Sequence, residues 1–243
     1  MRDAAADAGG QSCPALSMCT NYTPATPSDL SGLDRIDGWQ PLTAHWPAET
    51  FPGYAAPLLL AGEGGGLRLD TGRYGLVPRW CRDRRQAETV SRRTYNARSE
   101  TVAEKPSYRQ PWREKRWVVA PMRDFFEPCW ETGRAVRWRI RLADEPLFGA
   151  AGLHETWIDP HTGERVTSFT LLTVNADGHG LMRRMHRPED EKRMLVLLPA
   201  HDWSRWLQAD TAEALGLLQE AGSRCLEGEP APARPERQQA LGF

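Results

Sequence analysis

The chain has 243 residues, enough for one sizeable domain or two small ones. Hydrophobic residues make up 40% and charged residues 26%, with a formal net charge of −1, as in ordinary soluble globular proteins. No apolar run reaches the roughly 18 residues that a membrane helix needs, so a helical membrane protein is excluded.

The N-terminal residues 1–17 are rich in Ala, Gly, Ser and Asp and have no hydrophobic periodicity. They contain no apolar stretch of signal-peptide length, so we expect a cytoplasmic protein. We interpret residues 1–17 as a disordered extension or a wrongly chosen start. The main domain is then expected over residues 18–226.

Basic residues concentrate between Arg79 and Arg123, a segment that contains thirteen Lys/Arg and only five Asp/Glu. Five Trp and Tyr residues lie in the same segment. Cations mixed with aromatic rings suit single-stranded nucleic acid, because phosphates meet the cations and bases stack on the rings. Arg79, Trp80 and Arg109 are therefore candidate DNA contacts. The alternative is a solvated charged face with its tryptophans in the core.

Three elements are predicted in the middle of the chain. Ser99 can cap a short helix that Pro106 ends. The apolar run 117–121 predicts a strand that stops at Pro121. Between residues 136 and 142, apolar residues alternate with arginines, which predicts a half-buried strand with a basic outer face.

Further strands are predicted at 166–174 and 194–198, and helices at 201–208 and 211–222. The Pro- and Ala-rich residues 227–243 predict a disordered tail. Helices and strands do not alternate as in βαβ units. We therefore expect one α+β domain, with a largely antiparallel sheet or barrel-like core and flanking helices.

The five cysteines are an odd number, and none of them forms a CxxC pair. This pattern argues against both a disulfide framework and a zinc ribbon. No metal or other cofactor is expected.

Four short regions carry residues suited to chemistry. They are MCTNY (18–22), GLVPRW (75–80) with NARSETVAEKPSYRQPW (96–112), FFEP (125–128), and SFTLLTVNAD (168–177) with MHRPEDEKRMLVLL (185–198). In this order they resemble the SOS response-associated peptidase family, also called abasic-site processing proteins. The resemblance runs from about Met18 to about Trp206, and the NARSET…KPSYR segment is its most specific part.

The resemblance implies a monomeric, nucleoid-associated protein of the DNA-damage (SOS) response. Its N-terminal cysteine would form a thiazolidine crosslink with abasic sites in single-stranded DNA, and the chain would process its own N-terminus. Cys19 matches the nucleophile and Asn96 its neighbour in the pocket. Glu127 and His186 match the two acid/base groups.

Two further positions are implied by the same resemblance. Arg98 matches an arginine that contacts DNA phosphate, and Thr173 lines the site. The chain departs from the family where Thr20-Asn21 follows the cysteine in place of Gly-Arg, where Pro128 replaces a Trp, and in the longer RPEDEKRM insert. These departures affect the DNA contacts more than the catalytic residues.

The chemistry of a thiazolidine sets a condition on Cys19. An α-amine, with a pKa of about 7.7–8.0, is partly deprotonated near neutral pH and can attack an aldehyde. The thiol of the same residue then closes the ring, so Cys19 must be the first residue of the mature chain. Translation from Met18 or self-cleavage before Cys19 would meet this condition. A His and a carboxylate can open the sugar ring and move protons.

Two other functions stay open. A cysteine peptidase that acts on other proteins could use Cys19 with His186 and Asn96. A non-catalytic module could bind single-stranded DNA through the basic segment alone. Each residue also has a structural interpretation: an incidental thiol at Cys19, a surface carboxylate at Glu127, a structural His186, and Asn96 with Arg98 bracing the helix near Ser99.

Overall fold

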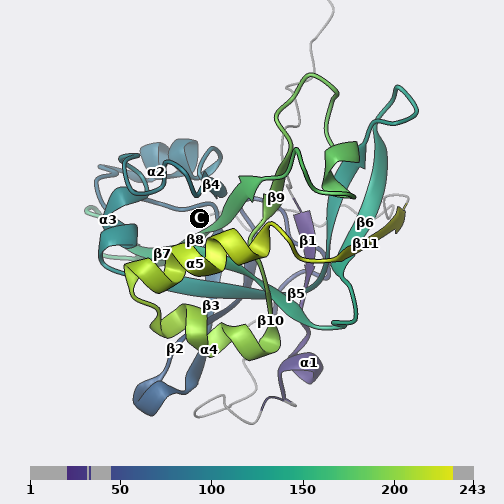
Figure 1. Cartoon of the computed structure of the whole chain (residues 1–243). Coiled ribbons are helices and arrows are strands. Elements are labelled where there is room, and N and C mark those ends of the chain that lie inside the picture. The colour runs from purple at the N-terminus through teal and green to yellow at the C-terminus, as the bar shows by residue number, and fades with distance from the viewer. Residues whose placement is uncertain (1–20, 32, 34–44, 232–243) are drawn as a thin grey trace, which may run out of the picture.

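The computed structural model describes residues 21–31, 33 and 45–231 (Figure 1). Cys19, the expected nucleophile, lies outside the described residues. Eleven strands join in one sheet, and five described helices and three short 3-10 turns surround it. No helix within the described ranges is long and apolar enough to cross a membrane.

Five strands close into a barrel. They are β2 (Ala55–Ala61), β3 (Leu67–Tyr74), β5 (Trp117–Cys129), β7 (Phe148–Ile158) and β8 (Arg165–Asn175). The order β5-β7-β8-β3-β2 returns to β5 through the pairing of β2 with β5. All neighbours in this ring run antiparallel except β3 and β8, which run parallel. The predicted barrel-like, largely antiparallel core is therefore confirmed.

Shorter strands extend the barrel. The strand β1 (Asn21–Pro24) lies along β5, while β4 (Asn96–Arg98) and β9 (Arg193–Leu195) both pair with β8. β10 (Leu197–Pro199) pairs with β7. Outside the ring, β6 (Val136–Leu142) and β11 (Leu226–Pro230) continue the sheet from β5.

Four of the five described helices lie on the barrel in two groups. The helices are α1 (Pro27–Ser31), α2 (Arg84–Ser91), α3 (Arg109–Arg113), α4 (Trp203–Gln208) and α5 (Thr211–Ala221), with 3-10 turns η1 (Glu63–Gly65), η2 (Met182–Arg184) and η3 (Ala200–Asp202). In Figure 1, α4 and α5 cross the front, and α2, α3 and β4 lie on the side away from β6 and β11. Trp203 and Trp206 of α4 are buried, and the Trp206 indole donates to the Val118 carbonyl.

The predicted helices at 201–208 and 211–222 are present, and the strand at 136–142 has the predicted bounds. The basic face of that strand is neutralised by acidic residues on neighbouring elements. Arg137 pairs with Glu49, and Arg141 pairs with Glu227 on β11. The β6 arginines are thus engaged within the protein.

The predicted bounds of two strands are wrong. The strand β5 continues through Pro121 to Cys129, because Pro121 lies where β5 changes partners from β7 to β1. The missing proline N–H costs little there, and the Pro121 carbonyl accepts from the Ala25 N–H at 2.9 Å. The run 194–198 forms two strands, because the chain switches from β8 to β7 at Val196.

The helix predicted from Ser99 is also wrong. Residues 99–108 form successive turns, in which Thr101 and Tyr108 donate to carbonyls three residues back. The Ser99 N–H donates to the Thr173 carbonyl at 2.9 Å, so the sheet holds the position that a helix would need. At the other end, β11 crosses the boundary that composition predicts at residue 226.

Candidate functional site

A buried acid–base pair lies at the end of β5. Glu127 is 2% exposed and His186, which follows η2, is 3% exposed. The His186 Nδ1 lies 3.7 Å from the Glu127 Oε2. The His186 N–H donates to the Pro128 carbonyl at 2.8 Å, and its φ of 60° turns the chain sharply at this point. The structure therefore brings together two of the four predicted catalytic residues.

The second ring nitrogen of His186 defines where its proton lies. The His186 Nε2 is 3.3 Å from the Arg193 carbonyl, which can only accept, so Nε2 carries the proton. Burial lowers the pKa of His186 below its ordinary value of 6.5, although the bond to Arg193 opposes this shift. The unprotonated Nδ1 of that tautomer faces the Glu127 carboxyl group. A histidine beside a carboxyl group is suited to general acid–base chemistry.

The loop that carries His186 is anchored by His179. The Nδ1 atom of His179 accepts the N–H groups of Leu181 and Met182, and its Nε2 lies 2.9 Å from the Arg224 carbonyl. One imidazole thus caps η2 and joins this loop to the segment between α5 and β11. We infer that His179 fixes the start of the turn that ends at His186.

Asn96 begins β4 and is 7% exposed. Its side-chain oxygen accepts from the Tyr74 hydroxyl at 3.0 Å, and its carbonyl accepts from the Tyr108 hydroxyl at 3.1 Å. Tyr74 stacks on Phe169 and meets Tyr22 edge to face, with ring centroids 5.7 Å apart. The amide is therefore held in one orientation by an aromatic cluster that reaches β1.

Arg193 is a buried cation that sequence reasoning did not select. It is 2% exposed, and its guanidinium donates twice to Glu100 at 2.8 Å and once to the Thr173 carbonyl at 2.7 Å. The Arg193 backbone carbonyl also lies 3.3 Å from the His186 Nε2 and accepts its hydrogen bond. Arg193 thus links Thr173 and the NARSET segment to the histidine. The signal for it in the sequence was weak, because an arginine before an apolar run usually lies at the surface.

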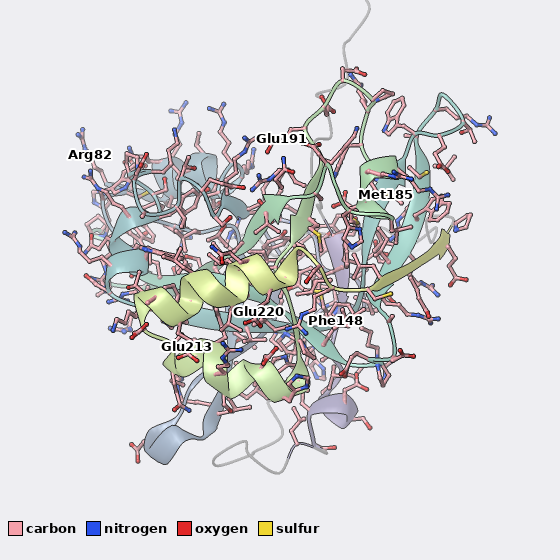
Figure 2. The ribbon with its side chains drawn as sticks, in the orientation of Figure 1. Arg82, Phe148, Met185, Glu191, Glu213 and Glu220 are labelled. Atoms are coloured by element: carbon pink, nitrogen blue, oxygen red, sulfur yellow. The ribbon has the colours of Figure 1, made fainter. Side chains whose placement is uncertain are left out.

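Arg98 and Thr173, the two predicted DNA-side residues of the motif segments, are neighbours. They are register partners in the β4–β8 pairing. Thr173 is buried, whereas the Arg98 side chain is 52% exposed and forms an ion pair with Glu191 at 2.7 Å. Figure 2 shows Glu191 beside the end of β9, on the side facing α2 and β4.

The other three candidate DNA contacts lie apart from this pair. Arg79 is bound to the buried Glu155 at 2.8 Å, near the opposite end of β8, where Glu155 is the register partner of Ser168. Burial raises the pKa of Glu155, and the bonds to Arg79 and the Thr156 N–H oppose that shift. Arg79 therefore has a clear structural role.

Trp80 and Arg109 are both exposed and lie on the α2–α3 side of the molecule. Trp80 is 47% exposed, and its indole N–H lies 3.4 Å from the Pro106 carbonyl. Arg109 is the first residue of α3. A ring open to solvent beside cations has the character of a base-stacking surface.

The described chain begins next to the acid–base pair. Asn21, the first residue of β1, is the register partner of Phe126, which directly precedes Glu127. Cys19 precedes Asn21 by two residues along the chain. In the described part of the chain, no group of three or more His, Cys, Asp or Glu side chains could hold a metal ion.

Comparisons with known proteins agree on one family. The sequence model of the SOS response associated peptidase (SRAP) family matches residues 18–233. Abasic site processing protein YoqW of Bacillus subtilis is 30% identical over 194 residues, covering 78% of this chain and 80% of that protein. Abasic site processing protein HMCES of Pongo abelii is 27% identical, covering 60% and 48%. A crystal structure of a protein from Bordetella bronchiseptica matches with a TM-score of 0.77 at 28% identity, covering 88% and 100%.

Proposed function

Because the chain belongs to the SOS response associated peptidase (SRAP) family, we propose that it processes abasic sites in DNA through a covalent adduct on Cys19. Relatives in this family carry the name abasic site processing protein. Such a role is enzyme-like chemistry on a DNA lesion. The single-stranded substrate, the thiazolidine product and self-processing belong to the proposal.

The observation that supports this proposal most is the position of the Glu127–His186 pair. It lies beside β1, whose first residue Asn21 is two residues from Cys19. Two residues of extended chain span at most about 7 Å, and the proposal requires the amine and thiol of Cys19 to act within that reach of Asn21. Asn96 reaches the same β1 through Tyr74 and Tyr22.

The proposed reaction proceeds in three steps. Acid–base exchange with the pair opens the hemiacetal of the abasic sugar and exposes its C1′ aldehyde. The α-amine of Cys19 adds to C1′ and water leaves, which gives an imine. The Cys19 thiol then adds to C1′ as its proton moves to the imine nitrogen. The thiazolidine holds one new C–N bond and one new C–S bond, and one water is released.

Recognition of DNA is proposed to use the α2–α3 side together with Arg98. Arg98 supplies a partly exposed guanidinium within the motif segment, and Trp80 supplies an open aromatic face. An unpaired strand exposes its bases for such stacking, whereas a duplex does not. The preference for single-stranded DNA rests on this argument.

The adduct requires a free α-amine at Cys19, so removal of Met18 and everything before it is part of the proposal. The chain could begin at Met18 and lose that residue, or it could cleave itself before Cys19. A Cys19→Ser variant that keeps the upstream residues, while the wild type loses them, would support self-cleavage.

The test mixes processed protein with single-stranded DNA that contains one abasic site, followed by a denaturing gel. We expect a slower band that withstands denaturation and is absent for Cys19→Ala and for intact DNA. Absence of the band with correctly processed wild type would refute the proposal. Cleavage of unrelated peptides without DNA would favour the peptidase alternative, and binding unaffected by Cys19→Ser without any crosslink would favour the binding module.

A further inference from the structure

One carboxylate sits among three nitrogen donors at the edge of the candidate site. Glu191 lies 2.7 Å from Arg98, 2.9 Å from Arg193 and 3.3 Å from the Asn175 amide. Arg98 is on β4, and Asn175 and Arg193 are register partners on β8 and β9. The three donors therefore come from adjacent strands and converge on one anion.

The protein does not need Glu191 to neutralise the buried cation in this cluster. Arg193 already donates twice to Glu100 at 2.8 Å and to the Thr173 carbonyl. Arg98 is different, because Glu191 is its ion-pair partner and its side chain is 52% exposed. The Arg98–Glu191 pair is thus the part of the cluster that an outside anion can reach.

The loop that presents Glu191 is fixed at its base. The Lys192 N–H donates to Asp177 at 2.9 Å, and the Lys192 carbonyl accepts from Ala176 at 2.8 Å. The same loop begins at His186, whose ring binds the Arg193 carbonyl. Glu191 is consequently presented from a loop with a fixed base, and its side chain is 35% exposed.

We infer that Glu191, held by Arg98, Asn175 and Arg193, occupies the position on Arg98 that a DNA phosphate takes, and that it stays there until DNA arrives. Carboxylates and phosphates are bound by guanidinium groups through the same charge-assisted hydrogen bonds. A phosphate of the bound strand takes the place of the Glu191 carboxylate on Arg98. This inference rests on the proposed function, since it assigns one phosphate contact of the same DNA.

Displacement of Glu191 from Arg98 is expected to lower the affinity for every DNA strand. Arg98 must exchange one anion for another, so intact single-stranded DNA binds more weakly than it would to an open arginine. Exposed ion pairs contribute modestly, so removing the Glu191 charge is expected to tighten binding by roughly three- to fivefold.

The test measures the dissociation constant of fluorescent single-stranded DNA without an abasic site for wild type, Glu191→Gln and Glu189→Gln. Glu189 is exposed in the same loop, and within the described residues it forms no ion pair. The Glu189→Gln substitution therefore makes the same change in net charge but leaves the Arg98–Glu191 ion pair intact. We expect tighter binding for Glu191→Gln and a much smaller effect for Glu189→Gln.

A double-mutant cycle with Arg98→Ala completes the test. In that background Glu191→Gln is expected to change the affinity no more than Glu189→Gln does. Equal tightening by both glutamine variants, or a Glu191→Gln effect that survives without Arg98, would overturn the inference. Because this experiment uses intact DNA, it can fail while the abasic-site crosslink still forms, and the crosslink can fail while it succeeds.

Discussion

At the residue scale, the candidate chemistry depends on Glu127 and His186 acting as a unit. The Nε2 atom of His186 lies against the Arg193 carbonyl, burial lowers the pKa of the imidazole, and Nδ1 faces the Glu127 carboxyl group 3.7 Å away. Placed together, a histidine and a carboxyl group can give a proton to a sugar oxygen and take one back.

Substitution of either member should therefore slow adduct formation without weakening DNA binding. We expect Glu127→Gln and His186→Gln each to reduce the rate about a hundredfold, as for loss of one general acid–base group. The double variant should be little slower than the worse single variant, because the pair acts together. Single-turnover crosslinking rates measure this, and multiplicative losses would show that Glu127 and His186 act independently.

Buried histidines also set how stability depends on pH. Burial, with the charge of Arg68 nearby, lowers the pKa of His154 from 6.5 to about 4. The unfolded chain then binds a proton that the folded chain does not, so stability is lost as pH falls from about 6.5 toward 4. His186 shifts in the same direction.

His154→Gln removes one of these groups. Urea unfolding at pH 7 and pH 5 should show a smaller loss of stability for His154→Gln than for wild type. The difference is at most about 1.36 kcal/mol per pH unit for one histidine. The same loss in both proteins would mean that folding does not lower the pKa of His154.

At the element scale, β8 organises the site. It pairs with β7, β3, β4 and β9, so residues far apart in sequence meet along its length. Its neighbour β7 can approach so closely because it carries Gly152. A Cβ at Gly152 would lie 2.3 Å from the Thr170 carbonyl, a fixed backbone atom.

Gly152→Ala is therefore expected to destabilise the protein by about 2–4 kcal/mol, since the sheet must separate to admit one methyl group. Gly216→Ala is the control, because Gly216 lies within α5 and a Cβ there would meet nothing within 4 Å. Alanine favours helix, so this variant should gain about 0.5–1 kcal/mol. Thermal unfolding of both variants measures the contrast, and a neutral Gly152→Ala would contradict the tight β7–β8 packing.

The sequence pattern predicts an element well where one face of the element packs on the core along its whole length. The alternation of β6 gave its bounds because one side packs on the core and the other carries arginines. Prediction from the sequence pattern failed where a strand changes partners, at Pro121 of β5 and at Val196 between β9 and β10. Those ends depend on which strand lies alongside, and local composition does not contain that information.

Predictions for the site differ in the same way. Asn96, Arg98, Glu127, Thr173 and His186 follow from local motifs, and the structure groups them as neighbours around β8 and β5. Arg193 and Glu191 were missed, because their roles come from contacts with Thr173 and Arg98 across strands. Arg79 carries the same basic character as Arg98, yet it is engaged by the buried Glu155.

At the scale of the whole molecule, positive charge is arranged on two sides with different consequences. The β6 arginines are paired with acids, as Arg141 is with Glu227 at 2.7 Å. Arg109 on the α3 side is exposed, and it forms no ion pair within the described residues. The side with α2 and α3 therefore offers charge to a polyanion, although the net charge is −1.

Arg109→Ala should weaken binding to single-stranded DNA of any sequence and reduce the salt slope of log K by about 0.7, the value for one phosphate contact. Arg141→Ala should change neither quantity appreciably, because that guanidinium is already engaged by Glu227. Affinity measured over a range of salt concentrations tests both. Equal effects of the two variants would place the DNA elsewhere.

The most direct measurement is the intact mass of the crosslinked species, followed by mapping of the modified peptide. We expect a protein chain that begins at Cys19 and carries the DNA at its N-terminal residue. Its mass should equal that of the two reactants less one water. A crosslinked chain that retains residues before Cys19, or that carries the DNA on a lysine, would contradict the proposal.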